Sequence, residues 1–254
     1  MKKKIYGVIV TSLLLMIAVT GCGLKTPEDI IKKAANNMDK LENYNMKIAM
    51  EMSMNTEGQV MDLNMNIDSD IDEKNETVKM KMDIDLAGFS VTADSYVVSK
   101  DGKTTTYIKD MTTDKWTKEI EDEEENESAP DISDILKDGK NIKEVEIKEE
   151  NTKKYVITIN KEDSQKLFGS MGNTGENLAG EDLPITGDVK LEVTIDTKNN
   201  YVKSMKMDMT DVMEKVEDVT YDKMLMTFEF SKFNAVGEVK VPEAIVNSAI
   251  EYKE

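Results

Sequence analysis

The chain of 254 residues has no histidine, no arginine, one cysteine and one tryptophan. Without histidine it cannot form a Ser-His-Asp or Cys-His catalytic arrangement, nor a histidine-ligated zinc or iron site. No serine is followed three residues later by a lysine, which removes the serine–lysine acylase pattern as well. Paired carboxylates remain available, but a sugar-cleaving site usually also needs aromatic platforms, and Trp116 is the only tryptophan. We therefore expect a protein that is not an enzyme and that holds no metal ion and no cofactor.

Acidic residues greatly outnumber basic ones. The sequence has 51 aspartates and glutamates against 33 lysines, which gives a net charge of -18 at pH 7. A surface of this charge repels anionic lipid headgroups and nucleic acids. We therefore expect no nucleic-acid partner, and we expect membrane contact to come from an anchor rather than from the folded surface.

The longest apolar run lies at the N-terminus, where residues 2–4 are lysines and Ile5 to Val19 follow. A run this short and this early is typical of a secretory signal rather than of a membrane span. It leads through Thr20 and Gly21 to Cys22, the only cysteine. An exported protein with a single cysteine cannot form an internal disulfide, so the thiol needs another role. The alternative is an uncleaved anchor helix in which the thiol is incidental.

The residues that end at Cys22 resemble the lipobox of bacterial lipoproteins, in which the cysteine sulfur receives a diacylglyceryl group and the cysteine amine becomes the new N-terminus. The resemblance implies a signal peptide at residues 1–21, a lipidated tether at 22–25, and a position at the extracytoplasmic face of the cell membrane. Two or three acyl chains such as palmitate, at about 0.8 kcal/mol per buried methylene, hold a protein stably where one chain does not. Cleavage before Cys22 removes three lysines, so the net charge changes from -18 to -21.

A capped helix followed by strands is predicted from Thr26 onward. Thr26 suits an N-cap and Pro27 the first helical position, and apolar residues at helical spacing continue to Leu41, with an end expected near Asn43. From Tyr44 the apolar period changes from 3.6 to 2, which is typical of strands with one wet face. The alternating segments are 44–54, 61–71, 78–86, 89–99, 104–108, a short one at Trp116, 141–148, 153–160, 189–195, 202–209 and 224–230.

Several segments do not alternate in this way. Short helices are predicted at 131–137 and 161–168, and the acid-rich run 121–127 is interpreted as a solvated loop rather than a cation site. The segment 169–187, rich in glycine and asparagine, is either a mobile lid or a plain loop. The segment 211–218 suits either a helical turn or a continued strand. A short amphipathic tail closes the chain.

Ten or eleven antiparallel strands and one leading helix predict a single mainly β domain with some α structure at residues 26–254. Strand twist makes a sheet of this size curl on itself. We therefore expect a curled antiparallel sheet that forms a half-open β-barrel, with the N-terminal helix and the short mid-chain helices covering its concave face.

This order of elements resembles the LolA/LppX-like superfamily of lipoprotein carriers, and most closely its uncharacterised Gram-positive lipoprotein branch. The matching features are the capped helix running into Tyr44, the segment from Tyr96 to Trp116 with its Asp-Gly turn, and the closing residues Phe233 to Pro242. The resemblance implies that the concave face binds acyl chains or another apolar molecule. The chain differs from shuttling carriers in keeping its own anchor and in having no arginine inside the barrel, so local capture at the membrane is expected.

The sequence contains nineteen methionines, several of them at alternate strand positions. Flexible thioethers suit a surface that adapts to varied apolar ligands, or a soft ion such as Cu(I), or they are plain core residues. On the ligand hypothesis, we predict a groove lined by Met46, Ile48, Met50, Met52, Met65, Met80, Met82, Met205, Met207, Met226 and Phe228.

A calcium loop is excluded by the sequence. Asp68, Asp70 and Asp72 have the spacing that opens an EF-hand loop. The sixth position, however, is Glu73 rather than glycine, and the twelfth is Lys79 rather than glutamate. We expect these aspartates to share the solvent face of a strand.

Two functions remain. The first is a membrane-anchored extracytoplasmic lipoprotein that binds a lipid or another apolar ligand without catalysis. The second is a surface interaction or structural lipoprotein whose barrel is filled by its own side chains and whose acidic exterior binds a protein partner. An open groove on the order of several hundred cubic ångströms would favour the first, and a tightly packed interior the second.

Overall fold

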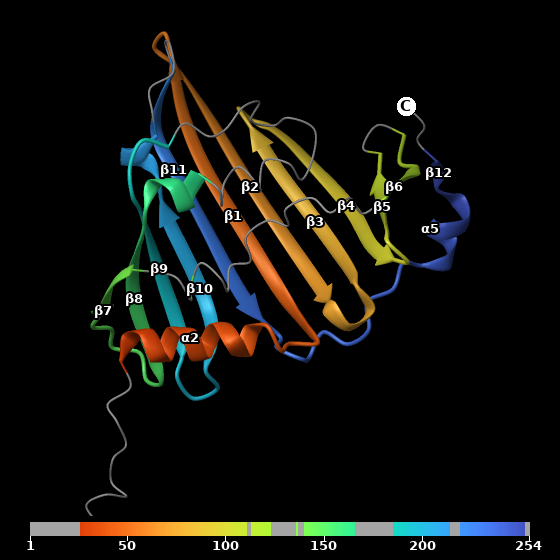
Figure 1. Cartoon of the computed structure of the whole chain (residues 1–254). Coiled ribbons are helices and arrows are strands. Elements are labelled where there is room, and N and C mark those ends of the chain that lie inside the picture. The colour runs from red at the N-terminus through yellow and green to blue at the C-terminus, as the bar shows by residue number, and fades with distance from the viewer. Residues whose placement is uncertain are drawn as a thin grey trace, which may run out of the picture.

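The computed structural model describes residues 26–110, 113–122, 136, 140–165, 185–213 and 219–251. These residues form one twelve-stranded sheet with helix α2 (Pro27–Met38) lying across one face (Figure 1). The strands are β1 (Asn43–Thr56), β2 (Gln59–Asp72), β3 (Thr77–Leu86), β4 (Phe89–Lys100), β5 (Lys103–Lys109), β6 (Trp116–Asp122), β7 (Lys140–Val145), β8 (Thr152–Ile159), β9 (Val189–Asp196), β10 (Tyr201–Asp208), β11 (Val219–Ser231) and β12 (Ile250–Glu251). None of the described helices is long and apolar enough to cross a membrane.

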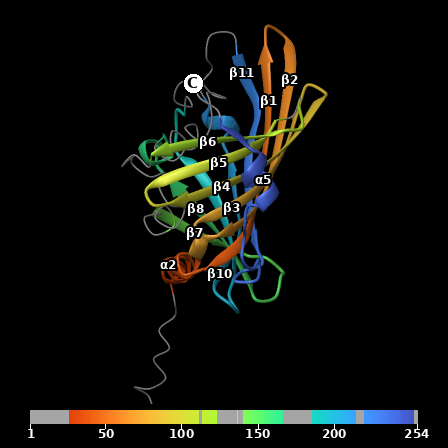
Figure 2. The same ribbon diagram turned by 90° about the vertical axis from the view of Figure 1, so that its right-hand side faces the viewer.

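The sheet is curled but not closed. Its strand order is β12-β6-β5-β4-β3-β2-β1-β11-β10-β9-β8-β7, so β1 joins the N-terminal meander to the C-terminal strands. All pairs are antiparallel except β12 with β6. Figure 2 shows that β4, β5 and β6 run across the direction of β1, β2 and β11. The predicted mainly β fold with a half-open barrel is confirmed.

The predicted start of the N-terminal helix is confirmed in detail. The Thr26 hydroxyl accepts a hydrogen bond from the Asp29 backbone N–H, and the Asp29 carboxylate accepts one from the Thr26 backbone N–H, both at 3.2 Å. These two bonds form a capping box and satisfy donors that the first helical turn leaves open. On the inner side, Ile31, Ala34 and Ala35 are fully buried against the sheet. The helix ends at Met38 rather than near Asn43, because β1 already begins at Asn43.

Each predicted strand is present, with ends shifted by up to five residues. Three hairpins of the meander turn on two residues that both have positive φ, at Glu57-Gly58, Ala87-Gly88 and Asp101-Gly102. Such turns match the twist of the flanking strands and fix their register. As a result most apolar residues of β1 to β4 lie on one face of the sheet, and Ala49, Val60, Tyr96 and Val98 lie on the other.

Three predictions outside the strands need correction or completion. Glu121 and Asp122 belong to β6 and pair with Thr104 and Lys103, whereas the rest of the predicted acidic loop lies outside the described residues. Helix is present at residues 161–165, and its predicted extension to 168 lies outside the described residues. Of the predicted helix 131–137, only Leu136 is described, and it is helical and buried.

The remaining segments differ in how much of them is described. Residues 169–184 and 214–218 lie outside the described residues, as do the predicted signal peptide and tether. A short 3-10 turn, η2 (Thr210–Val212), covers the start of the segment 211–218, for which the sequence allows either a helical turn or a strand. The amphipathic tail contains α5 (Glu243–Ser248) and then β12, a two-residue parallel strand that the sequence did not predict.

A buried carboxylate ties this C-terminal segment to the sheet. Asp72 is 2% exposed, and its Oδ2 accepts hydrogen bonds from the Val239 backbone N–H at 3.0 Å and the Asn75 side chain at 2.7 Å. Burial raises the pKa of the Asp72 carboxyl, but the hydrogen bonds from the Asn75 side chain and from backbone N–H groups, including that of Val239, outweigh it and hold this pKa below its ordinary value. The folded protein therefore stabilises the ionised form of Asp72.

We predict that Asp72→Asn lowers the free energy of unfolding by about 1–3 kcal/mol at pH 7, because the new amide group faces donors instead of accepting from them. Because the folded pKa of Asp72 lies below the unfolded value of about 4, its contribution is present above that value and is lost as the pH falls through the folded pKa. Thermal unfolding from pH 7 to pH 2.5 should show the wild-type and variant midpoints converging in acid. The exposed Asp222→Asn is the control, and a difference that stayed constant with pH would contradict the prediction.

Candidate functional site

The sheet face that carries α2, called here the concave face, is apolar from β8 to β4. Side chains of adjacent strands align across it in rungs set by the strand register. One rung contains Leu191, Met207, Met226, Met50, Met65, Ile84 and Val91, on β9, β10, β11, β1, β2, β3 and β4 in that order. The next rung towards the hairpin turns contains Met224, Met52, Leu63, Leu86 and Phe89.

Exposure to solvent increases along both rungs. In the first, Met226 is 5% exposed, Met50 and Met65 are half-buried, and Val91 is 37% exposed. In the second, Met224 is 1% exposed and Phe89 is 79% exposed. The concave face therefore has a closed half on β8 to β11, and an open half on β1 to β4. We define the open half by Met50, Met52, Leu63, Met65, Ile67, Met82, Ile84, Leu86, Phe89 and Val91.

The closed half is the packed core of the protein. Three side chains of α2 and Leu136 pack with buried residues of β8 to β11 in one cluster. Four residues predicted to line a ligand groove lie in this cluster and are 2–5% exposed: Met205, Met207, Met226 and Phe228. For these four the structure supports the interpretation as plain core residues, because they present almost no surface to a ligand.

The other predicted groove residues come together on three adjacent strands. All of them are half-buried and share the concave face. They are Met46, Ile48, Met50 and Met52 of β1, Met65 of β2, and Met80 and Met82 of β3. The predicted groove is based mainly on methionine positions and therefore does not include Leu63, Ile67, Ile84 and Val91. The alternation of these strands already placed the omitted residues on the same face, so the signal was present in the sequence.

The open half ends at two apolar hairpin turns. Val60 and Met61 follow the β1–β2 turn, and Leu86 and Phe89 flank the β3–β4 turn, all of them exposed. Figure 1 places both turns at the end of the sheet that is remote from α2. Monomeric soluble proteins seldom leave a large contiguous apolar surface in water, and such surfaces commonly bind something.

A cavity of about 350 Å³ lies at the opposite end, beside the C-terminal half of α2. Its described lining residues are Ala35, Met38, Asp39, Leu41, Tyr44, Met46, Glu73, Leu136, Val202 and Phe230. The Tyr44 and Phe230 rings are 6.3 Å apart, and the Tyr44 hydroxyl donates a hydrogen bond to Glu73 Oε1 at 3.3 Å. Met46 lines the cavity and precedes Ile48 and Met50 on the concave face, so the two regions adjoin along β1.

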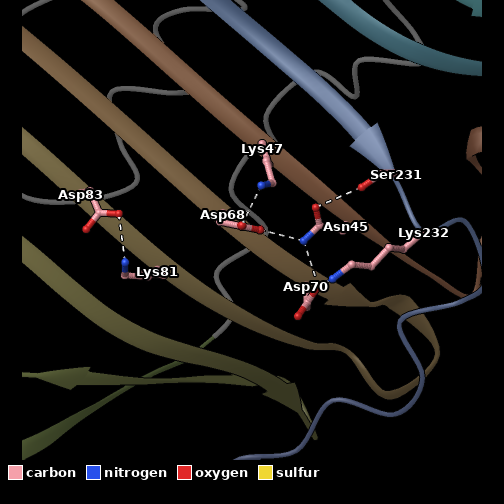
Figure 3. Close-up of polar contacts among 8 residues, drawn as sticks. All are labelled: Asn45, Lys47, Asp68, Asp70, Lys81, Asp83, Ser231 and Lys232. Atoms are coloured by element: carbon pink, nitrogen blue, oxygen red, sulfur yellow. Dashed lines mark hydrogen bonds and ion pairs between the residues drawn. The ribbon is translucent and has the colours of Figure 1, made fainter.

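The convex face of β1 to β3 is mostly polar, and several of its charged side chains form ion pairs or hydrogen bonds with neighbouring residues (Figure 3). The buried Asn45 side chain donates hydrogen bonds to Asp68 at 2.8 Å and Asp70 at 2.9 Å, and its Oδ1 accepts one from Ser231 at 3.2 Å. The hydrogen bond from Asn45 has the largest effect on the Asp68 carboxyl and, with Lys47, holds its pKa below the ordinary value despite partial burial. This network fixes β2 and β11 to β1.

Two further ion pairs neutralise carboxylates on the convex face. Lys232 lies 3.3 Å from Asp70, and Lys81 lies 3.2 Å from Asp83. Within the described residues, no group of three or more aspartates, glutamates, histidines or cysteines is placed to hold a metal ion. The polar contacts of the convex face hold the strands in register, whereas the concave face presents apolar side chains.

Several solved structures are similar to this chain. The crystal structure of LprF from Mycobacterium bovis has 11% identity and a TM-score of 0.48, covering 87% of this chain and 98% of that chain. A putative outer membrane lipoprotein-sorting protein domain from Vibrio parahaemolyticus has 12% identity and a TM-score of 0.26, covering 79% and 89%. A β-barrel-like protein from Brucella abortus, of the domain of unknown function DUF1849, has 10% identity and a TM-score of 0.27, covering 75% and 96%.

No curated protein matches the sequence. The model of one protein family, described as a family of unknown function (DUF6612), matches residues 26–250. That match spans the helix, all twelve strands except the last residue of β12, and both halves of the concave face. The chain therefore belongs to the DUF6612 family.

Proposed function

We propose that this protein is a lipoprotein that binds the acyl chain of a lipid, or another apolar ligand, on the open half of its concave face, without catalysis. The observation that carries the proposal is the increase in exposure across single rungs, from 1% at Met224 to 79% at Phe89. The same apolar pattern is buried in the core on one side and exposed to water on the other. A ligand on the open half would extend the core that the protein itself forms on the closed half.

The chemistry of the open half suits a flexible apolar chain. Each methylene removed from water contributes about 0.8 kcal/mol, so a long acyl chain gains substantial affinity without any polar contact. Met50, Met52, Met65 and Met82 supply unbranched side chains that adjust to the shape of the ligand. Such a surface binds a ligand according to the length of its apolar chain and does not recognise one particular molecule.

The alternative function, a surface protein with a self-filled barrel, accounts for the closed half only. There Met205, Met207 and Phe228 fill the interior at 2% exposure. It offers no role for the open half, whose apolar side chains are half-buried or exposed. This difference favours the ligand-binding function.

We further propose that Cys22 carries the lipid anchor at the extracytoplasmic face of the cell membrane. Cys22 is four residues before Thr26, the N-cap of α2. Four extended residues span at most about 14 Å, so α2 would start close to the bilayer surface. A ligand leaving the bilayer would meet the helix end of the concave face first, which agrees with local capture rather than transport through water.

The ligand proposal predicts a bound apolar molecule. The chain from Gly23 to Glu254, produced in a bacterial host and studied by native mass spectrometry, should carry a stoichiometric adduct that organic solvent extracts. A mass equal to that of the bare chain, unchanged after incubation with membrane lipids, would contradict the proposal and favour the interaction protein.

The open half should lose affinity when it becomes polar. We predict that Met65→Gln weakens binding of a fluorescent fatty acid about tenfold, because an amide must then be desolvated beneath the acyl chain. Asn66→Gln, at the next position and on the convex face, is the matched control and should leave the affinity unchanged. Equal effects of the two substitutions would place the ligand elsewhere.

The anchor depends on one sulfur atom. Cys22→Ala should leave an uncleaved or released protein, because no other side chain in the sequence can accept the diacylglyceryl group as a thioether. Membrane fractionation with detergent extraction, together with the mass of the product, measures the outcome. Unchanged cleavage and unchanged membrane extraction would show that Cys22 carries no anchor.

A further inference from the structure

The described methionines form two groups that differ in access to solvent. Five of them, on β10 and β11 and directly after β10, are 0–5% exposed: Met205, Met207, Met209, Met224 and Met226. Ten are half-buried or exposed: Met38, Met46, Met50, Met52, Met54, Met61, Met65, Met80, Met82 and Met213. All of these ten except Met38 and Met213 lie on the concave face of β1 to β3, and no methionine of the described strands lies on the convex face. The accessible thioethers are therefore concentrated on one surface.

The strand register brings several of these side chains together. Met50 of β1 lies directly opposite Met65 of β2, and Met54 lies opposite Met61. The Cβ atoms of directly opposite residues are about 4.5–5.5 Å apart, so a ligand that covers one thioether of a pair also covers the other. On its other side Met50 lies opposite Met226, which is only 5% exposed. The boundary between accessible and buried sulfur thus lies between β1 and β11, where the open half meets the closed half.

Thioethers of this kind react with hydroperoxides. A sulfur lone pair attacks one oxygen of hydrogen peroxide, so that an S–O bond forms while the O–O bond breaks. The departing hydroxide takes the proton of the transferred hydroxyl group and becomes water. Sulfur loses two electrons, the peroxide gains two, and the product is methionine sulfoxide, which is polar where methionine is apolar. The only cysteine, Cys22, is assigned to the anchor as a thioether, so no free thiol competes for the peroxide.

We propose that the methionines of the open half form an oxidation site for hydroperoxides, and that their conversion to sulfoxides releases the apolar ligand. They are Met50, Met52, Met65 and Met82. The release rests on the proposed function, whereas the oxidation site rests on the exposure of these side chains. An acyl chain on the oxidised surface must desolvate the S–O groups without giving them a hydrogen bond. A bound ligand covers the same sulfur atoms, so the ligand-free protein is oxidised first.

Peroxide footprinting tests the oxidation site. All described elements lie within residues 26–251, so the chain from Gly23 to Glu254 keeps the whole sheet and its core. This chain is freed of bound lipid on a hydrophobic resin and treated with hydrogen peroxide, and peptide mass spectrometry gives the oxidation rate of each methionine. We expect Met50 and Met65 to be oxidised about tenfold faster than Met205 and Met207, because susceptibility follows exposure. Equal rates would overturn the oxidation site and leave the proposed function intact.

Protection by a ligand links the oxidation site to the binding surface. A saturating amount of the fluorescent fatty acid should slow the oxidation of Met50 and Met65 about fivefold, because the bound fraction is closed to peroxide. Met213, which is half-buried and lies outside the open half, is the internal control and should be oxidised at an unchanged rate. Equal slowing at Met213, or no slowing while the fatty acid is bound, would overturn the proposed release.

Binding to the oxidised protein tests the release directly. After catalase has removed the peroxide, the oxidised chain should bind the fatty acid about tenfold more weakly than the untreated chain. Methionine sulfoxide reductases for both epimers should restore the affinity. Thermal unfolding checks that the oxidised chain is folded. Unchanged affinity after complete oxidation of the open half would overturn the release.

A leucine variant assigns the effect to the open half. The substitutions Met50→Leu, Met52→Leu, Met65→Leu and Met82→Leu keep the surface apolar at similar volume, so this variant should bind equally well before and after peroxide. Met213→Leu is the control and should stay as sensitive to peroxide as the wild type. An equal loss of affinity in the leucine variant would overturn the inference. No binding by the untreated wild type would contradict the proposed function and the release, while the footprint would still decide the oxidation site.

Discussion

The pairing of β1 with β2 on one side and β11 on the other is the interaction on which the rest of the structure depends. It joins the N-terminal meander to the C-terminal strands, and both pairings run nearly the full length of β1. Asn45 fixes the junction, because one buried amide bonds to carboxylates of β2 and to the Ser231 hydroxyl of β11. With this register the apolar residues of both halves of the chain form one continuous concave face.

One reason for the division of that face into a closed and an open half is the size of helix α2. A helix of 12 residues is about 18 Å long, whereas strands about 4.8 Å apart make a twelve-stranded sheet roughly three times as wide. Helix α2 therefore covers only part of the sheet. Its main contacts lie with β10 and β7, so β2 to β4 keep an apolar surface that α2 does not cover.

Local rules in the sequence predicted most of the fold, and tertiary placement explains what they missed. The capping box at Thr26 and the alternation from Tyr44 onward define the helix and the strands. Alternation assigns a side chain to a face but does not say what covers it, so Met207 and Met65 looked equivalent although one is buried and the other is half-exposed. The two-residue strand β12 carries no periodic signal, and the cavity at α2 unites residues from positions 35 to 230 that no sequence spacing connects.

The methionines themselves offer the most direct test of the central claim, that the open half binds an apolar ligand. Methyl NMR of the protein labelled at methionine, recorded with increasing amounts of a long-chain amphiphile, reports on both halves in one experiment. The account predicts shifts in the methyl signals of Met50, Met65 and Met82, while those of Met205 and Met207 stay in place. Shifts confined to the buried methionines, or no shift at a concentration where the amphiphile binds, would contradict it.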